Sequence, residues 1–208
     1  KNRNTYVHAL DYYYNNGFTY VEVGDGDELG ENSRFKIIHL AHTDAINAMK
    51  RFHDHGRMIM LYGNHNILLR NDQYVKNHYY RFYNEFTEEY NDLFNRLEPR
   101  EALLLRHRRT ELEIFVVHGH QGDLPNDTLW RLSAFSLRYI WRHLHSFGFK
   151  NPASPVNNVF KSHKLEKNYN KWVTKNQKLL ICGHTHRFKF PRKDDPPYFN
   201  SGCCIYPA

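Results

Sequence analysis

Two histidines, His184 and His186, stand one residue apart after an apolar run, Leu179–Cys182, and a glycine. The run predicts a buried strand, because it is too short to form a free-standing helix. Gly183 allows a sharp turn where the strand ends, so the two imidazoles can converge on one small volume. A pair of imidazoles suits a transition metal, although an isolated pair is more often two polar loop residues.

Other apolar runs also end in side chains that can bind metals. Asp25 follows one such run, Asn64 and His65 follow the next, and His118 follows a third. Carboxylate, amide oxygen and imidazole together suit Mn, Fe or Zn better than Mg or Ca. Each residue alone could be an ordinary turn aspartate, a left-handed asparagine or a loop histidine. The repeated pattern makes a shared metal site the better hypothesis.

In chain order these strand ends resemble the calcineurin-like metallophosphoesterase family. The family shows G-D-x-x-[DE], G-N-H-[DE], a histidine followed by glycine, and G-H-x-H. The matching segments here are residues 24–28, 63–66, 118–119 and 183–186. The resemblance runs from about residue 18 to residue 202 and implies one domain over residues 1–208. The implied fold is α/β, a two-sheet β-sandwich flanked by helices in four layers, α/β/β/α, with a helical cap inserted at about 126–173.

The resemblance also implies roles for the ligands of two divalent transition metal ions, Mn, Fe or Zn. Asp25 would bridge the two ions, and Asn64, His118 and His184 would complete the second metal site. His186 would belong to the first site. Paired ions of this kind clamp an in-line displacement at phosphorus.

The implied chemistry is hydrolysis of a phosphomonoester or phosphodiester by metal-activated water. His65 would be the catalytic imidazole near the leaving-group oxygen, and Glu28 the acid that orients it. The family's opening D-x-H motif is absent from residues 1–208, and we expect the native gene to encode it, after a strand, upstream of Lys1. Asn66 stands where the family usually has an acidic residue that is not a direct ligand.

Hydrophobic periodicity around these motifs predicts helices alternating with strands. The predicted helices cover residues 6–15, 35–55, 74–97, 126–145 and 156–173. The predicted strands cover residues 18–23, 58–62, 102–105, 112–117, 179–182 and 198–200. Sites built on strand-end loops belong at one edge of such a sheet.

The segment between His118 and His184 is expected to choose the substrate. Arg131 lies on one predicted helix, and Lys164 and Lys167 belong to a lysine stripe on the next. Such a stripe is most often a solvated face, but it could hold a second phosphate or an anionic head group.

Two alternatives to a general phosphoesterase stay open. The cationic helical insertion is similar to that of the UDP-2,3-diacylglucosamine pyrophosphohydrolases of lipid A synthesis, which typically carry arginine where this chain has His65. The missing D-x-H motif supports a degenerate, non-catalytic binding module instead.

The composition indicates which kinds of partner the protein binds and in which cellular compartment it is expected. Lys and Arg total 29 against 22 Asp and Glu, a formal net charge of +7, which favours anionic partners. We expect a phosphorylated small molecule or a lipid-linked substrate, with nucleic acid as a less favoured alternative. No apolar run reaches the length of a membrane span. The 3 cysteines form no C-x-x-C pair, which indicates reduced thiols and a cytoplasmic protein. The sequence indicates no oligomeric state.

Overall fold

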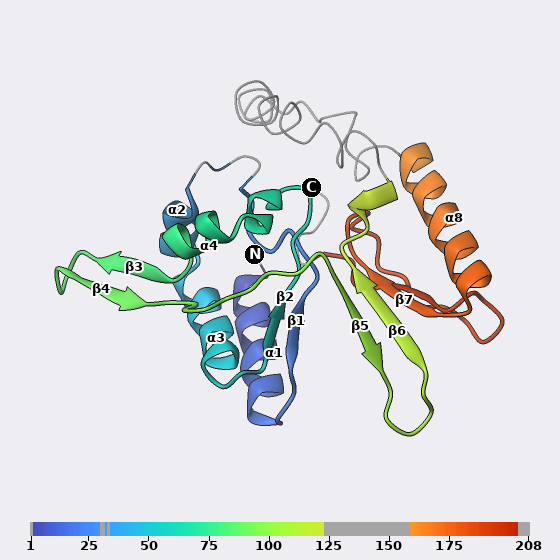
Figure 1. Ribbon diagram of the computed structural model, residues 1–208, viewed down its shortest axis with the longest axis horizontal. Helices are drawn as coiled ribbons and strands as arrows, with labels where there is room; N and C mark the ends of the chain where they lie inside the picture. Colours follow the sequence, from blue (N-terminus) through green and yellow to red (C-terminus); the bar gives the residue numbers. More distant parts are fainter. Residues whose placement is uncertain (1, 30–31, 33, 123–158, 204–208) are drawn as a thin grey trace.

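The computed structural model describes residues 2–29, 32, 34–122 and 159–203. Arg131 and the predicted helix at 126–145 lie outside the described residues. The mixed α/β class is confirmed (Figure 1). The four-layer α/β/β/α sandwich stays a prediction.

The first half of the chain is built around a parallel pair of strands. Strand β1 (Tyr20–Glu22) pairs with β2 (Met58–Met60), with Val21 opposite Ile59. The helices before and between these strands are α1 (Arg3–Asn15), α2 (Phe35–Ala41) and α3 (Thr43–Asp54). Helices α1 and α3 lie side by side next to the strand pair (Figure 1).

The sequence predicts a single helix over residues 35–55, but the structure has two. The helical conformation is interrupted at His42, whose φ is −131°. The Thr43 hydroxyl donates to the carbonyl of His39, and the Asp44 carboxylate accepts from the amide of Ala45. Side-chain bonds of this kind offer the backbone an alternative to the continuous helical ladder.

The prediction of one helix over residues 74–97 is wrong. After η1 (Ile67–Arg70), helix α4 (Asp72–His78) is short, and the chain continues as a hairpin of β3 (Arg81–Asn84) and β4 (Glu89–Asp92). Aromatic residues favour strands as well as apolar helix faces. Asn84 decides the outcome locally, because its side chain accepts a hydrogen bond from the amide of Phe86 and starts the turn.

The second half forms a four-stranded sheet in the order β5-β6-β7-β8. Its strands are β5 (Ala102–Arg106), β6 (Glu113–Val117), β7 (Leu179–Cys182) and β8 (Tyr198–Asn200). Strands β5 and β6 are antiparallel, whereas β6, β7 and β8 run parallel. A short turn, η2 (His120–Gly122), follows β6. All the predicted strands are therefore present.

Helix α8 (Val159–Asn176) covers the four-stranded sheet (Figure 1). Leu165, Tyr169 and Val173, spaced four residues apart, are buried with the side chains of β7 and β8. The hydroxyl of Tyr169 also donates to the carbonyl of Gly119, at 2.6 Å. The helix is thereby tied to the segment that follows β6.

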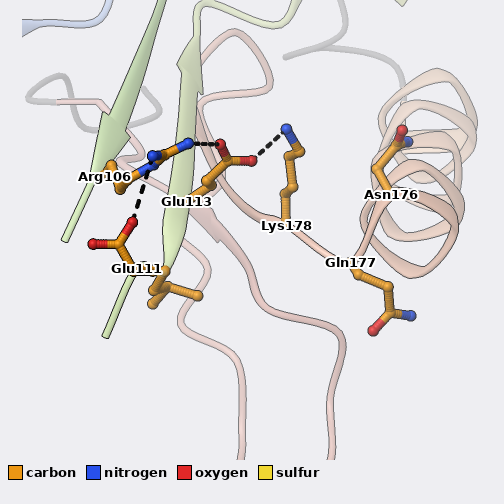
Figure 2. Close-up of a pocket in the computed structure, with 7 residues that line it drawn as sticks. Arg106, Glu111, Glu113, Asn176, Gln177 and Lys178 are labelled. Atoms are coloured by element: carbon orange, nitrogen blue, oxygen red, sulfur yellow. Dashed lines mark hydrogen bonds and ion pairs between the residues drawn. The ribbon is translucent and has the colours of Figure 1, made fainter. Parts of the chain in front are cut away.

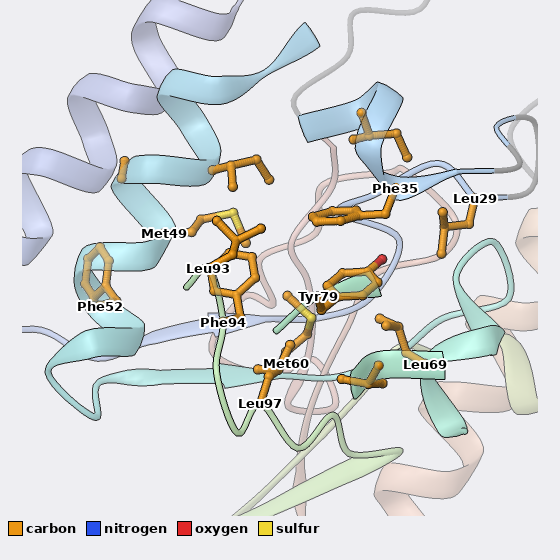
Figure 3. Packing of buried hydrophobic residues seen from close by; sticks show 14 of the residues in the cluster. Leu29, Phe35, Met49, Phe52, Met60, Leu69, Tyr79, Leu93, Phe94 and Leu97 are labelled. Carbon is orange, nitrogen blue, oxygen red and sulfur yellow. The ribbon is translucent and has the colours of Figure 1, made fainter. Parts of the chain in front are cut away.

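The larger apolar core is formed by residues of the first half of the chain, between Leu10 and Leu97 (Figure 3). Ala45, Ala48, Met49 and Phe52 repeat at the spacing of one helix face and turn α3 toward it. The ring of Tyr79 stacks on Phe35 with centroids 3.9 Å apart. This core fixes β1 and β2, and with them the loops that leave their ends.

One buried side chain in this region makes stability depend on pH. His39 packs against the rings of Phe35 and Phe82, and its Nε2 makes no hydrogen bond within the described chain. Burial lowers the pKa of His39 below 6.5, so the folded state favours the neutral ring while the unfolded chain takes up a proton. The contribution of His39 to the free energy of unfolding should therefore hold steady above about pH 6.5 and fall as the pH drops below it.

Urea denaturation at about pH 5 and about pH 7.5 measures this dependence. His39→Leu should remove this contribution and so change the difference between the two pH values, whereas the same change at the exposed His8 should not. An equal pH dependence in wild type and His39→Leu would contradict the assignment.

Candidate metal centre

The loops that carry the predicted ligands leave strand ends that lie close together. The pairing of β1 with β2 extends to a bond from the amide of Leu61 to the carbonyl of Glu22, at 2.8 Å. The pairing of β6 with β7 extends to a bond from the amide of Gly183 to the carbonyl of His118, at 3.0 Å. The loops that carry Asp25 and Asn64 therefore start at the carboxyl ends of β1 and β2. Those that carry His118 and His184 start at the carboxyl ends of β6 and β7.

The side chain of His118, which follows β6 of the four-stranded sheet, contacts the chain just after β1 of the β1–β2 pair. Its Nδ1 lies 2.9 Å from the carbonyl oxygen of Val23, which follows β1. Because a carbonyl oxygen can only accept, Nδ1 carries a hydrogen, and Nε2 either donates a hydrogen bond or, without a proton, offers a lone pair. That nitrogen faces Asp25 Oδ2 at 2.9 Å and Asn64 Oδ1 at 3.2 Å. Three electron-rich atoms that face one another need a proton or a cation between them.

His184 brings a further imidazole to the same place. One of its ring nitrogens lies within 4.8 Å of the ligand atoms of Asp25 and His118. Ligands around a single transition metal ion lie roughly 3–4 Å apart, given metal–ligand distances of about 2.0–2.2 Å. Small side-chain movements would therefore bring these donors onto one ion. The donor set of carboxylate, amide oxygen and two imidazoles fits Mn, Fe or Zn.

The backbone at these positions is strained. Asp25, His184 and His186 have φ values of 60°, 65° and 57°, in the left-handed region. Each such residue costs of order 1–3 kcal/mol, and such residues persist where the surroundings hold them, often at functional sites. Two of the three, Asp25 and His184, belong to the cluster of converging donor atoms.

The charge of the Asp25 carboxyl group depends on the histidines next to it. Burial by itself raises the pKa of Asp25, but the imidazoles of His118 and His65 outweigh it and hold the pKa well below its ordinary value. Asp25 is therefore a carboxylate across the neutral pH range. Burial also raises the pKa of Glu22, on β1, to about 7.

His65 and Glu28 form a second, more accessible pair beside the cluster. The ring Nδ1 of His65 lies 2.7 Å from Glu28 Oε1, and its backbone amide donates to Asp25 Oδ1 at 2.9 Å. The side chain of His65 is 30% exposed, so a substrate can reach it. The sequence predicts this contact between imidazole and orienting acid, and the structure brings the two side chains together.

A buried network of hydrogen bonds behind the loop was not predicted. Asn66 accepts a hydrogen bond from the amide of Gly63 and donates to Asp27, and the hydroxyl of Tyr79 donates to the other oxygen of Asp27. Burial raises the pKa of Asp27 to about 6, against the effect of these two donors. Asn66 thus holds the loop that carries Asn64. Only tertiary contact reveals Tyr79, which lies 52 residues from Asp27.

His120 is also part of the interior. Its ring centroid lies 5.5 Å from that of His118 and 6.5 Å from that of His184. From the sequence it would be a supporting or a surface residue. The structure buries it beside His118 and His184, with 1% of its surface exposed.

The remaining predicted residues lie outside the cluster. His186 is more exposed than His184, and within the described chain it joins no group of converging ligand atoms. Lys164 and Lys167 are exposed on α8, away from its buried inner face, and nothing in the described chain connects them with Asp25. Arg131 lies outside the described residues.

A shallow pocket near the start of β6 is a poorer candidate (Figure 2). It lies at the amino-terminal end of β6, whereas His118 follows the carboxyl-terminal end of that strand. Its charges already satisfy one another, because Arg106 pairs with Glu111 and Glu113, and Lys178 pairs with Glu113. No unpaired charge among these residues points to a ligand.

Glycines allow the close approach of the loops. A Cβ at Gly24 would lie 2.8 Å from the amide nitrogen of Gly63 and from Nδ1 of His118. A Cβ at Gly63 would lie 2.2 Å from Asp25 Oδ1 and 2.8 Å from Cδ2 of His118. These two positions must stay without side chains for the cluster to form.

Gly63→Ala should therefore displace Asp25 and weaken metal binding by at least about tenfold, a loss seen even for changes behind the ligands. Isothermal titration with Mn²⁺ or Zn²⁺ measures the affinity. Gly183→Ala is the matched control, because a Cβ there meets only Ser201 Oγ at 3.6 Å and His118 at 3.9 Å. Similar affinities in the two variants would contradict the close packing of Gly63 on Asp25.

Comparison with known proteins gives no relative. No family, no curated protein and no solved structure matches this chain. Among the described helices, none is long and apolar enough to cross a membrane. The interpretation of the site therefore depends on its own geometry and on the motifs of the sequence.

Proposed function

We propose that the chain is a metal-dependent phosphoesterase that hydrolyses a phosphomonoester or phosphodiester. The observation that carries the proposal is the convergence of Asp25, Asn64 and His118 on one point, with His184 beside them. These donors can hold a divalent Mn, Fe or Zn ion. A bound ion of this kind would lower the pKa of water toward 7 and neutralise phosphoryl oxygens.

Side chains of the protein have separate roles in the proposed reaction. Asp25 stays a carboxylate, because His118 and His65 depress its pKa, and it would hold the cation. The carbonyl of Val23 accepts a hydrogen bond from Nδ1 of His118, which leaves Nε2 as the ring nitrogen that would bind the ion. His65 donates a proton to the leaving-group oxygen, and Glu28 orients its ring.

The proposed centre has two ions, and the described residues supply a ligand set for one of them. His186 borders this set and is assigned to the other ion. Reconstitution with one metal at a time, followed by metal analysis, distinguishes one ion per chain from two.

The function is tested by adding Mn²⁺, Fe²⁺ or Zn²⁺ to chelator-treated protein and following hydrolysis of p-nitrophenyl phosphate and bis(p-nitrophenyl) phosphate. We expect metal-dependent activity that His118→Ala abolishes. The matched control is His107→Ala, which removes an exposed histidine from the turn between β5 and β6. Tight metal binding without hydrolysis of either ester would contradict the proposal and favour a binding module.

A further inference from the structure

The chain that follows His186 presents two phenylalanines on a fixed backbone. Lys189 and Asn200 exchange backbone hydrogen bonds of 3.1 and 3.0 Å, which attach this segment to the end of β8. Gly202 packs closely on Phe188, since a Cβ there would lie 3.1 Å from the Cβ of Phe188. The segment is therefore held in register at two points.

Alternate residues of this segment face opposite sides. Lys189 turns inward, with its Nζ 4.8 Å from the ring centroid of Tyr198. Phe188 and Phe190 turn outward and are 74% and 71% exposed. Their rings are inclined by only 28°, with centroids 6.3 Å apart, and Phe190 is braced edge-on by Phe199 at 4.8 Å. We call Phe188 and Phe190 the phenylalanine pair.

Cationic residues flank the phenylalanine pair along the chain. Residues 187–193 include Arg187, Lys189, Arg192 and Lys193, of which Lys189 turns inward, and Asp194 and Asp195 follow. Within the part of the chain that the structure describes, none of these four is engaged in an ion pair. The net charge of the whole chain is +7. The surface therefore combines exposed aromatic faces with uncompensated cations.

The pair lies close to the metal centre. Phe188 is four residues after His184, so their Cα atoms are no more than about 14 Å apart. A ligand whose phosphate lies at the cluster can therefore extend over the rings with a few neighbouring units.

We propose that the substrate is a single-stranded nucleic acid, with bases stacked on the phenylalanine pair and a phosphodiester at the metal centre. This inference rests on the proposed phosphoesterase function. Aromatic faces beside cations are the usual way to bind single strands, because every base has a face to stack and every linkage carries a charge. A lipid chain would need an apolar groove, whereas these rings offer flat faces to solvent.

Binding is tested without catalysis, by fluorescence anisotropy of a labelled oligothymidylate of about ten nucleotides with chelator-treated protein. The double variant Phe188→Ala/Phe190→Ala should raise the dissociation constant at least tenfold, because stacking on one aromatic ring changes binding by roughly 5- to 150-fold. Added salt should weaken binding further. The matched control is Phe86→Ala, which removes a phenylalanine that is 100% exposed between β3 and β4.

Hydrolysis of the oligonucleotide and of bis(p-nitrophenyl) phosphate separates this inference from the proposed function. We expect the double variant to lower the ratio of kcat/KM for the oligonucleotide to that for the small ester by tenfold or more. Hydrolysis of the small ester by wild type, with no binding of the oligonucleotide, would overturn the inference alone. Ring-dependent binding without hydrolysis of either substrate would support the stacking of bases on the phenylalanine pair and overturn the phosphoesterase.

A membrane surface is the competing occupant. Vesicles of phosphatidylglycerol, assayed by co-sedimentation, provide that comparison. If the double variant loses vesicle binding while its affinity for the oligonucleotide matches that of wild type, the nucleic-acid inference fails.

Discussion

His65→Ala is expected to lower kcat/KM for an unactivated phosphodiester by about 10²–10⁴-fold while the protein keeps its metal. The geometry explains why the two effects separate. The contact from His65 to Asp25 is made by the backbone amide, at 2.9 Å, and alanine keeps it. Only the imidazole, which Glu28 holds at 2.7 Å, is lost.

The leaving group provides the internal control for this prediction. A p-nitrophenyl ester needs little protonation as it departs, so its hydrolysis should suffer much less than that of an alkyl ester. Glu28→Gln, which keeps the size of the orienting side chain but removes its charge, should give a smaller loss of the same kind. Equal losses on activated and unactivated esters would refute the role of His65 as a general acid.

Asp25→Asn is expected to remove the metal and, with it, the activity. The amide has the shape of the carboxylate but lacks the negative charge that His118 and His65 maintain in Asp25. Substitutions behind metal ligands already cost 10- to 100-fold in affinity, so the loss of this ligand should exceed about 100-fold. Elemental analysis after gel filtration measures the metal bound per chain.

Asp195→Asn is the control for that measurement, because Asp195 is exposed in the turn before β8. Circular dichroism verifies that both variants fold. A full complement of metal in folded Asp25→Asn would show that Asp25 is not a ligand.

The strand ends could be predicted from the sequence because their signals are local. An apolar run that stops at a glycine and a polar side chain predicts where Asp25, Asn64, His118 and His184 stand along the chain. The parallel pairing of β1 with β2 and of β6 with β7 then brings them to adjoining edges. The structure adds the distances and the hydrogen bond of His118 Nδ1 to Val23, on which the metal hypothesis depends.

The features that the sequence did not predict correctly, or did not predict at all, depend on contacts between segments that are separated in the chain. The aromatic spacing over residues 74–97 suits a helix, but Asn84 and the pairing of Tyr83 with Tyr90 make it a hairpin. The support that Asn66 and Tyr79 give to Asp27 joins segments far apart in the chain. The outward side of the phenylalanine pair likewise depends on the register of Lys189 with Asn200.

The lysine stripe of α8 stays a prediction about substrate. Lys164 and Lys167 are exposed on the side of α8 away from its buried residues. If they hold a second phosphate, changing both to alanine should raise KM for a bulky diphosphate and leave metal content unchanged. A solvated face would leave KM unchanged.

The metal centre itself is tested most directly by anomalous scattering from crystals grown with Mn²⁺ or Zn²⁺. We expect a peak bounded by Asp25 Oδ2, His118 Nε2, Asn64 Oδ1 and a ring nitrogen of His184. No peak at this position with saturating metal, or an ion bound only elsewhere, would contradict the account.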